Sequence, residues 1–133
     1  MAIRNYNNQN LHDRVIRQAV TQLDTAGHEI FINCYEDRNA WIGENVPDII
    51  MVTKGTSNVK FIIEVETADS VNINEATTQW KKFATEISAS FYILVPNTHR
   101  NIAVTLCKQV GISARIGTYN VDIFGTITAI SYE

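Results

Sequence analysis

The sequence predicts an α/β domain in which helices flank a mixed central sheet. Three segments carry apolar residues at helical spacing, six shorter segments are apolar runs, and two of these runs lie close enough to form a hairpin. The chain has 133 residues, of which 45% are hydrophobic and 19% are charged. These values are typical of one globular domain that can bury a core.

The first helix is expected over residues 10–26, where Asn10 is the predicted N-cap and Gly27 the predicted stop. Residues 1–10 are predicted to be a loose polar segment, and residues 11–133 to be a single domain. His12 lies near the centre of the apolar stripe of this helix, which favours a packed or capping histidine over a catalytic one. Asp13 is expected to cap the helix.

The remaining elements follow in order along the chain. Strands are predicted over residues 28–35, 48–53 and 59–66, a helix over 73–87, a strand over 91–95, a helix over 98–110 that stops at Gly111, and two strands over 114–119 and 121–130 that are joined near Asn120. A hairpin followed by strand-helix-strand crossovers implies a mixed sheet. Trp41, Trp80 and Tyr119 are expected to pack in the core.

Composition limits the classes of function. No run of 18 apolar residues is present, so no membrane span is expected, and the N-terminus lacks the apolar region of a secretory signal. Cys34 and Cys107 lie in apolar segments and form no zinc motif, which favours a reducing, cytoplasmic setting. The net charge of -3 counts against strong nonspecific nucleic-acid binding, although a basic patch offset by an acidic metal site remains compatible with it.

An acidic constellation lies on the hairpin formed by residues 48–66. If its turn centres on Thr56, residues whose numbers sum to 112 lie opposite each other, so Asp48 faces Glu64. Strand alternation then places Glu66 on the same side. Like charges so close are unfavourable without compensation, and a divalent cation with oxygen ligands supplies it. The alternative is a solvated strand end whose carboxylates pair with Lys or Arg; the apolar surroundings favour the metal site.

These residues resemble the PD-(D/E)XK nuclease-like superfamily, also called restriction endonuclease-like. Its pattern is Pro-Asp on one strand and (Asp/Glu)-x-Lys on the next, which here corresponds to Pro47-Asp48 and Glu64-Val65-Glu66. The element order from about Leu11 to Val110 is similar to the αβββαβ core of that family. The chain departs from the pattern at Glu66, which replaces the usual lysine.

The resemblance implies a Mg²⁺- or Mn²⁺-dependent DNA endonuclease, which is a phosphodiester hydrolase. Asp48 and Glu64 are expected to bind metal, and Glu66 either to bind metal or to act as the general base. Gln79 is similar to the glutamine of the Gln-x-x-x-Tyr motif in RecB-like members, with Phe83 for the tyrosine, so the resemblance implies a catalytic role for Gln79. The alternative is a residue that only borders the apolar stripe of its helix. A homodimer is expected by resemblance as well.

Two alternatives stay open. One is a catalytically inactive domain of the same fold that serves DNA binding or protein assembly, and the other is an unrelated α/β binding module. The sequence leaves open whether the substrate is duplex, branched or single-stranded DNA, or RNA. It also leaves open any sequence specificity.

Overall fold

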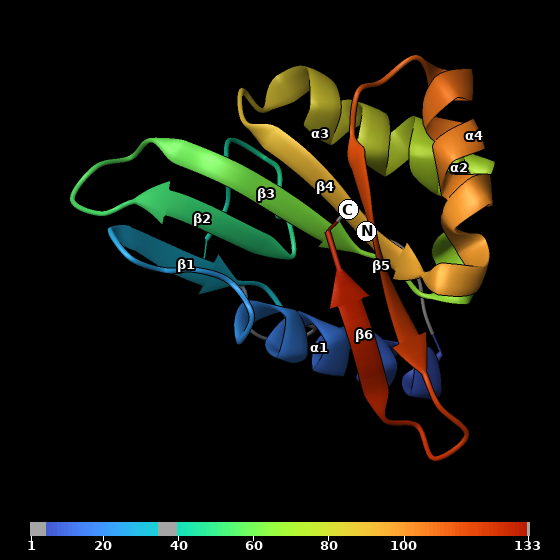
Figure 1. Cartoon of the computed structure of the whole chain (residues 1–133). Coiled ribbons are helices and arrows are strands. Elements are labelled where there is room, and N and C mark those ends of the chain that lie inside the picture. The colour runs from blue at the N-terminus through green and yellow to red at the C-terminus, as the bar shows by residue number, and fades with distance from the viewer. Residues whose placement is uncertain (1–4, 35–39, 133) are drawn as a thin grey trace.

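The computed structural model describes residues 5–34 and 40–132 (Figure 1). Its centre is a six-stranded mixed sheet with the strand order β1-β2-β3-β4-β5-β6. The strands are β1 (His28–Ile32), β2 (Ile49–Thr53), β3 (Val59–Val65), β4 (Ser90–Pro96), β5 (Arg115–Val121) and β6 (Ile127–Ser131). β3, β4 and β5 run parallel, and the other neighbours pair antiparallel. The predicted α/β class and the predicted order of elements are confirmed.

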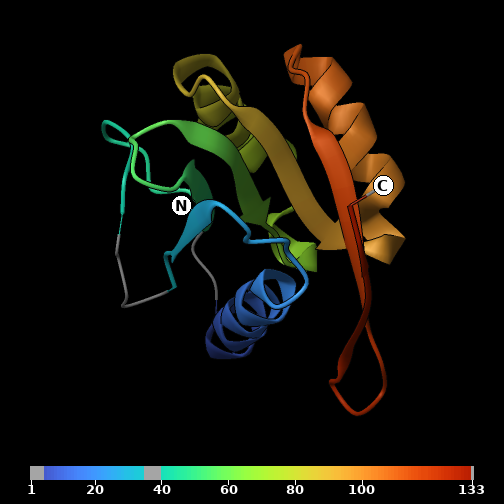
Figure 2. The same cartoon turned by 60° about the vertical axis from the view of Figure 1, so that its left-hand side comes forward.

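Helices cover both faces of the sheet (Figures 1 and 2). The helical elements are α1 (Tyr6–Val20), the 3₁₀ turn η1 (Ala68–Ser70), α2 (Ile73–Glu75), the π-helical turn η2 (Ala76–Trp80), α3 (Lys81–Glu86), the 3₁₀ turn η3 (Asn97–His99) and α4 (Arg100–Val110). In the described part of the chain, no helix is both long enough and apolar enough to cross a membrane.

Two hydrophobic clusters lie on opposite faces of the sheet because strand side chains alternate between them. On one face, Val15, Ile16 and Ala19 of α1 pack with Ile49, Ile63, Val65, Leu94 and Tyr119. On the other face, α2 to α4 pack on a cluster that includes Ile50, Ile62, Trp80, Phe83, Ile93, Val95 and Leu106. Cys34 and Cys107 are buried within these clusters as free thiols, as the sequence predicts.

The first helix differs from its prediction at both ends. It begins at Tyr6 rather than after Asn10, because Asn5 is the N-cap and its side chain accepts a 2.9 Å hydrogen bond from the backbone N–H of Asn8. The predicted loose segment is therefore helical from Tyr6 onward, and residues 1–4 lie outside the described part. The helix ends at Val20, so Gly27 does not stop it; Gly27 lies in the turn before β1 with a φ of 72°.

The turn between the last two strands lies at residues 122–126, not at Asn120, because Asp122 organises a hydrogen-bonded turn there. Trp41 was expected in the core but is 64% exposed, although its neighbours Ala40 and Ile42 pack against one of the two clusters. Gly111 ends α4 with a φ of 74°, as predicted. The predicted strand and loop residues 35–39 lie outside the described part of the chain.

Candidate metal centre

The β2–β3 hairpin has the register that the sequence predicts at its open end. Ile49 pairs with Ile63 and Ile50 with Ile62, so paired residue numbers sum to 112 and the next pair outward is Asp48 and Glu64. The backbone N–H of Asp48 donates a 2.9 Å hydrogen bond to Oε1 of Glu64. A register shift appears only nearer the turn, between Met51 and Val52, and leaves the acidic end unchanged.

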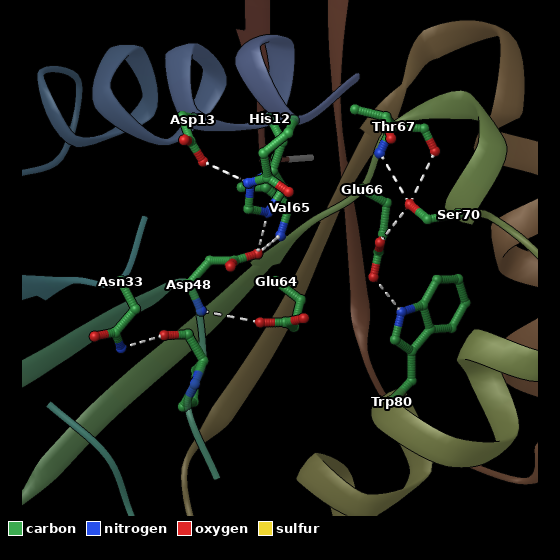
Figure 3. Close-up of polar contacts among 12 residues, drawn as sticks. His12, Asp13, Asn33, Asp48, Glu64, Val65, Glu66, Thr67, Ser70 and Trp80 are labelled. Carbon is green, nitrogen blue, oxygen red and sulfur yellow. Dashed lines mark hydrogen bonds and ion pairs between the residues drawn. The ribbon is translucent and has the colours of Figure 1, made fainter. Parts of the chain in front are cut away.

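Asp48 lies at the edge of the sheet between the two helical layers (Figure 3). Its Oδ2 accepts a 2.7 Å hydrogen bond from the backbone N–H of Val65 and lies 3.0 Å from Nε2 of His12 on α1. The side-chain amide of Asn33 donates a 2.7 Å hydrogen bond to the carbonyl oxygen of Pro47. Both the side chain of Asp48 and the backbone that precedes it are therefore fixed.

His12 is only 2% exposed and connects two carboxylates. Its Nε2 faces Asp48, and its Nδ1 lies 3.0 Å from Oδ1 of Asp13. The same oxygen of Asp13 accepts a 2.9 Å hydrogen bond from Gln9 Nε2, so Asp13 supports His12 rather than capping the helix. The prediction of a packed histidine is confirmed, and the structure adds a contact with a candidate site residue that helical periodicity could not reveal.

Glu66 is fully buried, and two neutral donors hold its carboxylate (Figure 3). Ser70 Oγ donates to Oε1 at 2.6 Å, and Trp80 Nε1 donates to Oε2 at 2.7 Å. Tyr119 donates its hydroxyl to the backbone carbonyl of Glu66 at 2.7 Å. These contacts fix the position and the orientation of the Glu66 carboxylate.

The sequence prediction did not include Glu75, which joins Glu64 and Glu66 in one buried group. One carboxylate oxygen of each lies within 4.8 Å of the others, and Glu64 and Glu75 are each 5% exposed. Glu75 follows the N-cap of α2, where Asn72 Oδ1 accepts a 2.8 Å hydrogen bond from its backbone N–H. Three carboxylates therefore meet in the layer between β3 and α2.

The π-helical turn η2 explains why Glu75 was missed. In a regular α-helix, residues five apart such as Glu75 and Trp80 point about 140° apart. In η2 the backbone N–H of Lys81 bonds to the carbonyl of Ala76, the five-residue spacing of a π-helix, which brings residues five apart toward one face. Glu75 and Trp80 therefore both reach the carboxylates. The residues of η2 carry no sequence pattern that indicates a π-helical turn.

The electrostatics of the cluster are unfavourable for charge at Glu64. Burial raises its pKa well above the usual 4.5, and the carboxylate of Asp48 raises it further. Glu66 and Glu75 act in the same direction, while the hydrogen bond from the Asp48 backbone lowers the pKa. Glu64 therefore favours its protonated form unless a positive charge enters the cluster.

Gln79 and three lysines that could replace the one missing from the family pattern lie as follows. Gln79 is half-buried in η2, one residue before Trp80, and its catalytic role stays a prediction. Lys60 is exposed on β3, four residues before Glu64, and Lys81 is exposed on α3. Lys82 approaches exposed Glu44 at 3.9 Å. None of these three lysines is buried with the carboxylates, so the structure offers no direct replacement for the lysine of the family pattern among them.

Comparisons with family models, with curated proteins and with solved structures found no significant match. The fold and the site themselves define the class of protein. It is an α/β domain with a six-stranded mixed sheet and a buried carboxylate cluster that could hold a metal ion.

Proposed function

We propose that this chain is a divalent-metal-dependent phosphodiester hydrolase of the PD-(D/E)XK superfamily that acts on DNA. The observation that supports this function most is the buried group of Glu64, Glu66 and Glu75 beside Asp48, at the carboxyl end of β3. Burying so many carboxylates together is costly for a domain unless a cation compensates them. A domain that only bound a partner through its surface would not need three buried carboxylates in one group.

The donor set fits a hard divalent cation. Its ligands are all carboxylate oxygens, which suit Mg²⁺ or Mn²⁺ better than soft metals. The raised pKa of Glu64 fits the same interpretation, because the neighbouring negative charges that raise it would be offset by a cation. Glu64, Glu66 and Glu75 would hold the ion, together with Asp48 at the edge of the group.

A cation there would supply Lewis-acid polarisation of a phosphodiester and activation of water. The residues of the chain supply position and proton transfer. Ser70 and Trp80 fix Glu66, and His12 and the Val65 backbone fix Asp48. Because the cluster has one more carboxylate than the family pattern, one of them can accept a proton from water while the others hold the cation. Glu66 or Glu75 would take that role in place of the missing lysine.

Cleavage assays test the proposal. Supercoiled plasmid and branched DNA would be incubated with Mg²⁺ or Mn²⁺ and with wild type, Asp48→Asn or Glu64→Gln, with the exposed Glu29→Gln as a matched control. We expect metal-dependent cleavage by wild type and the control, and a loss of at least about 100-fold in the two site variants. No cleavage of any substrate, or equal cleavage by the site variants, would contradict the proposal.

A second candidate is an inactive domain of the same fold that binds DNA or a protein. It is favoured by Glu66, which occupies the lysine position and already accepts hydrogen bonds at both oxygens. This candidate predicts cation binding or DNA binding without cleavage. The homodimer expected from the family resemblance applies to both candidates, and light scattering of the purified chain measures it.

A further inference from the structure

The tip of the β5–β6 hairpin presents two large hydrophobic side chains to solvent. Ile123 is 94% exposed and Phe124 is 86% exposed, the highest values for large hydrophobic residues in the part of the chain that the structure describes. The hairpin extends past the rest of the sheet in both views (Figures 1 and 2). Such residues at an exposed tip are unfavourable in water and suggest a binding role.

The tip is ordered before any partner binds. Asp122 Oδ1 accepts hydrogen bonds of 2.9 Å from the backbone N–H groups of Phe124 and Thr126. The backbone of Asp122 also pairs with Thr126 and with Gly125, each at 3.0 Å, and Gly125 has a φ of 80°. Because the turn is already fixed, little backbone entropy is lost when its side chains insert into a partner.

Helix α1 connects this tip to the candidate metal centre. Arg14 Nη1 donates a 2.9 Å hydrogen bond to the carbonyl oxygen of Gly125 in the hairpin turn. Two residues earlier on the same helix, His12 contacts Asp48. The helix therefore holds the hairpin tip and the acidic site in a fixed relation to each other.

The direction of the strands places the tip beyond the site. β3, β4 and β5 are parallel, so their carboxyl ends lie at one edge, where Tyr119 of β5 bonds to Glu66. From Tyr119 the chain continues four or five residues to the tip, about 15 Å at 3.3 Å per residue. Successive base pairs are about 3.4 Å apart, so a duplex aligned with β5 would meet the tip about four base pairs beyond Tyr119.

We infer that Ile123 and Phe124 form a wedge that inserts between base steps of a DNA duplex bound at the acidic site. This inference rests on the proposed function, which makes DNA the ligand. Apolar wedges of Phe or Ile are a recurrent means of unstacking a base step. The exposed guanidinium of Arg14 lies beside the tip, and exposed Arg100 begins α4 just after β4 at the same edge, so both are placed to contact phosphates.

The size of the tip favours DNA over a second copy of the chain. Two large side chains bury at most about 400 Å². A stable protein interface needs about 800 Å² from each partner. The tip alone is therefore too small for a dimer contact, whereas one or two side chains suffice to separate neighbouring base pairs.

Binding to duplexes that carry 2-aminopurine at successive positions tests the inference, with Ca²⁺ in place of the catalytic ion. Anisotropy reports affinity, and the emission of 2-aminopurine rises where a base is unstacked. We expect wild type to raise the emission at a localised step. The double variant Ile123→Ala/Phe124→Ala should lose this rise and bind about 10-fold to 100-fold more weakly. Phe124→Leu should retain most of the signal, and Trp41→Ala, which removes another exposed aromatic residue, should match wild type.

Other results would overturn the inference. One is that wild type and the double variant bind DNA with equal affinity and give equal 2-aminopurine emission. Another is that wild type does not bind duplex DNA. A third is that the double variant loses self-association while its DNA signals stay unchanged. Melting curves confirm that the variants fold, since neither side chain belongs to a core cluster. If cleavage requires Glu64 but not the tip residues, the proposed hydrolase function stands and the inferred wedge role is rejected. If the tip residues unstack DNA but the protein does not cleave it with Mg²⁺ or Mn²⁺, the wedge role stands and the hydrolase function is rejected.

Discussion

Replacing Glu64 with Gln should stabilise the metal-free protein, which is unusual for a change at a buried residue. Glu64 lies within 4.8 Å of the Glu66 and Glu75 carboxylate oxygens and is 5% exposed. Glutamine has nearly the same shape, and its carbonyl oxygen can still accept the hydrogen bond from the Asp48 backbone. Above its usual pKa, wild type must either ionise Glu64 beside the other carboxylates or take up a proton to keep it neutral, and glutamine avoids both costs.

The magnitude follows from the geometry. Two like charges at the 4.8 Å limit of this cluster repel by about 3.5 kcal/mol at an effective dielectric constant of about 20, which sets the scale of the cost of ionising Glu64 there. The hydrogen bond from the Asp48 backbone is weaker to a neutral amide oxygen than to a carboxylate, which lowers the free energy of unfolding by about 1 kcal/mol. We expect a net increase of about 2 kcal/mol in the free energy of unfolding at pH 8. For a domain of this size that corresponds to a melting temperature about 6–10 °C higher.

The effect should depend on pH. The pKa of Glu64 is raised in the folded protein, so its protonated form contributes stability that is fully present below about 4.5 and is lost as pH rises through the folded pKa. In EDTA, wild type should lose stability between pH 5 and pH 8 more steeply than Glu64→Gln. Mn²⁺ binds the ionised form, so it should stabilise wild type more at pH 8 than at pH 5.

Thermal melts at both pH values, with EDTA or with Mn²⁺, measure these differences. Glu29→Gln removes an exposed carboxylate from β1 and serves as the control, which should match wild type within about 0.5 kcal/mol. If Glu64→Gln were less stable than wild type in EDTA at pH 8, with the same dependence on pH, the electrostatic reasoning would be refuted.

Three further substitutions test the supports of the site and the sheet. Trp80→Phe removes the indole donor to buried Glu66, so urea unfolding should show a loss of about 2–3 kcal/mol, and a loss below 0.5 kcal/mol would show that the hydrogen bond contributes little. His12→Ala removes a buried partner of Asp48 and should cost about 2–3 kcal/mol, with part restored by His12→Asn; equal stability of the two variants would reject a polar role for the ring. Gly117→Ala would place its Cβ 2.8 Å from a backbone carbonyl oxygen of β6 and should cost about 1–3 kcal/mol, whereas a melting temperature equal to that of wild type would mean that the strands can separate without cost.

The sequence predicts the acidic hairpin well because its register depends on local features. The turn near Thr56 and the apolar runs on both sides leave one register that keeps the same faces buried, and that register brings Asp48 to Glu64. The element order was predictable for a similar reason, because helical and strand periods differ clearly. Neither result required knowledge of contacts between distant segments.

Other parts of the site depend on such contacts. Glu75 joins the cluster at the start of a π-helical turn, which the helical spacing of the sequence does not indicate. His12 reaches Asp48 across 36 residues of sequence, which no local pattern encodes. The start of α1 was missed because both Asn5 and Asn10 suit an N-cap, and the hydrogen bond from Asn8 to Asn5 selects the first.

Crystallography of the protein soaked with Mn²⁺ tests the central claim most directly, because anomalous scattering locates the ion independently of any activity. The carboxylate cluster predicts one strong anomalous peak with oxygen ligands from Glu64, Glu66 and Glu75, with Asp48 at its edge. If the carboxylates kept their positions at saturating Mn²⁺ and no peak appeared among them, the cluster would not be a metal centre.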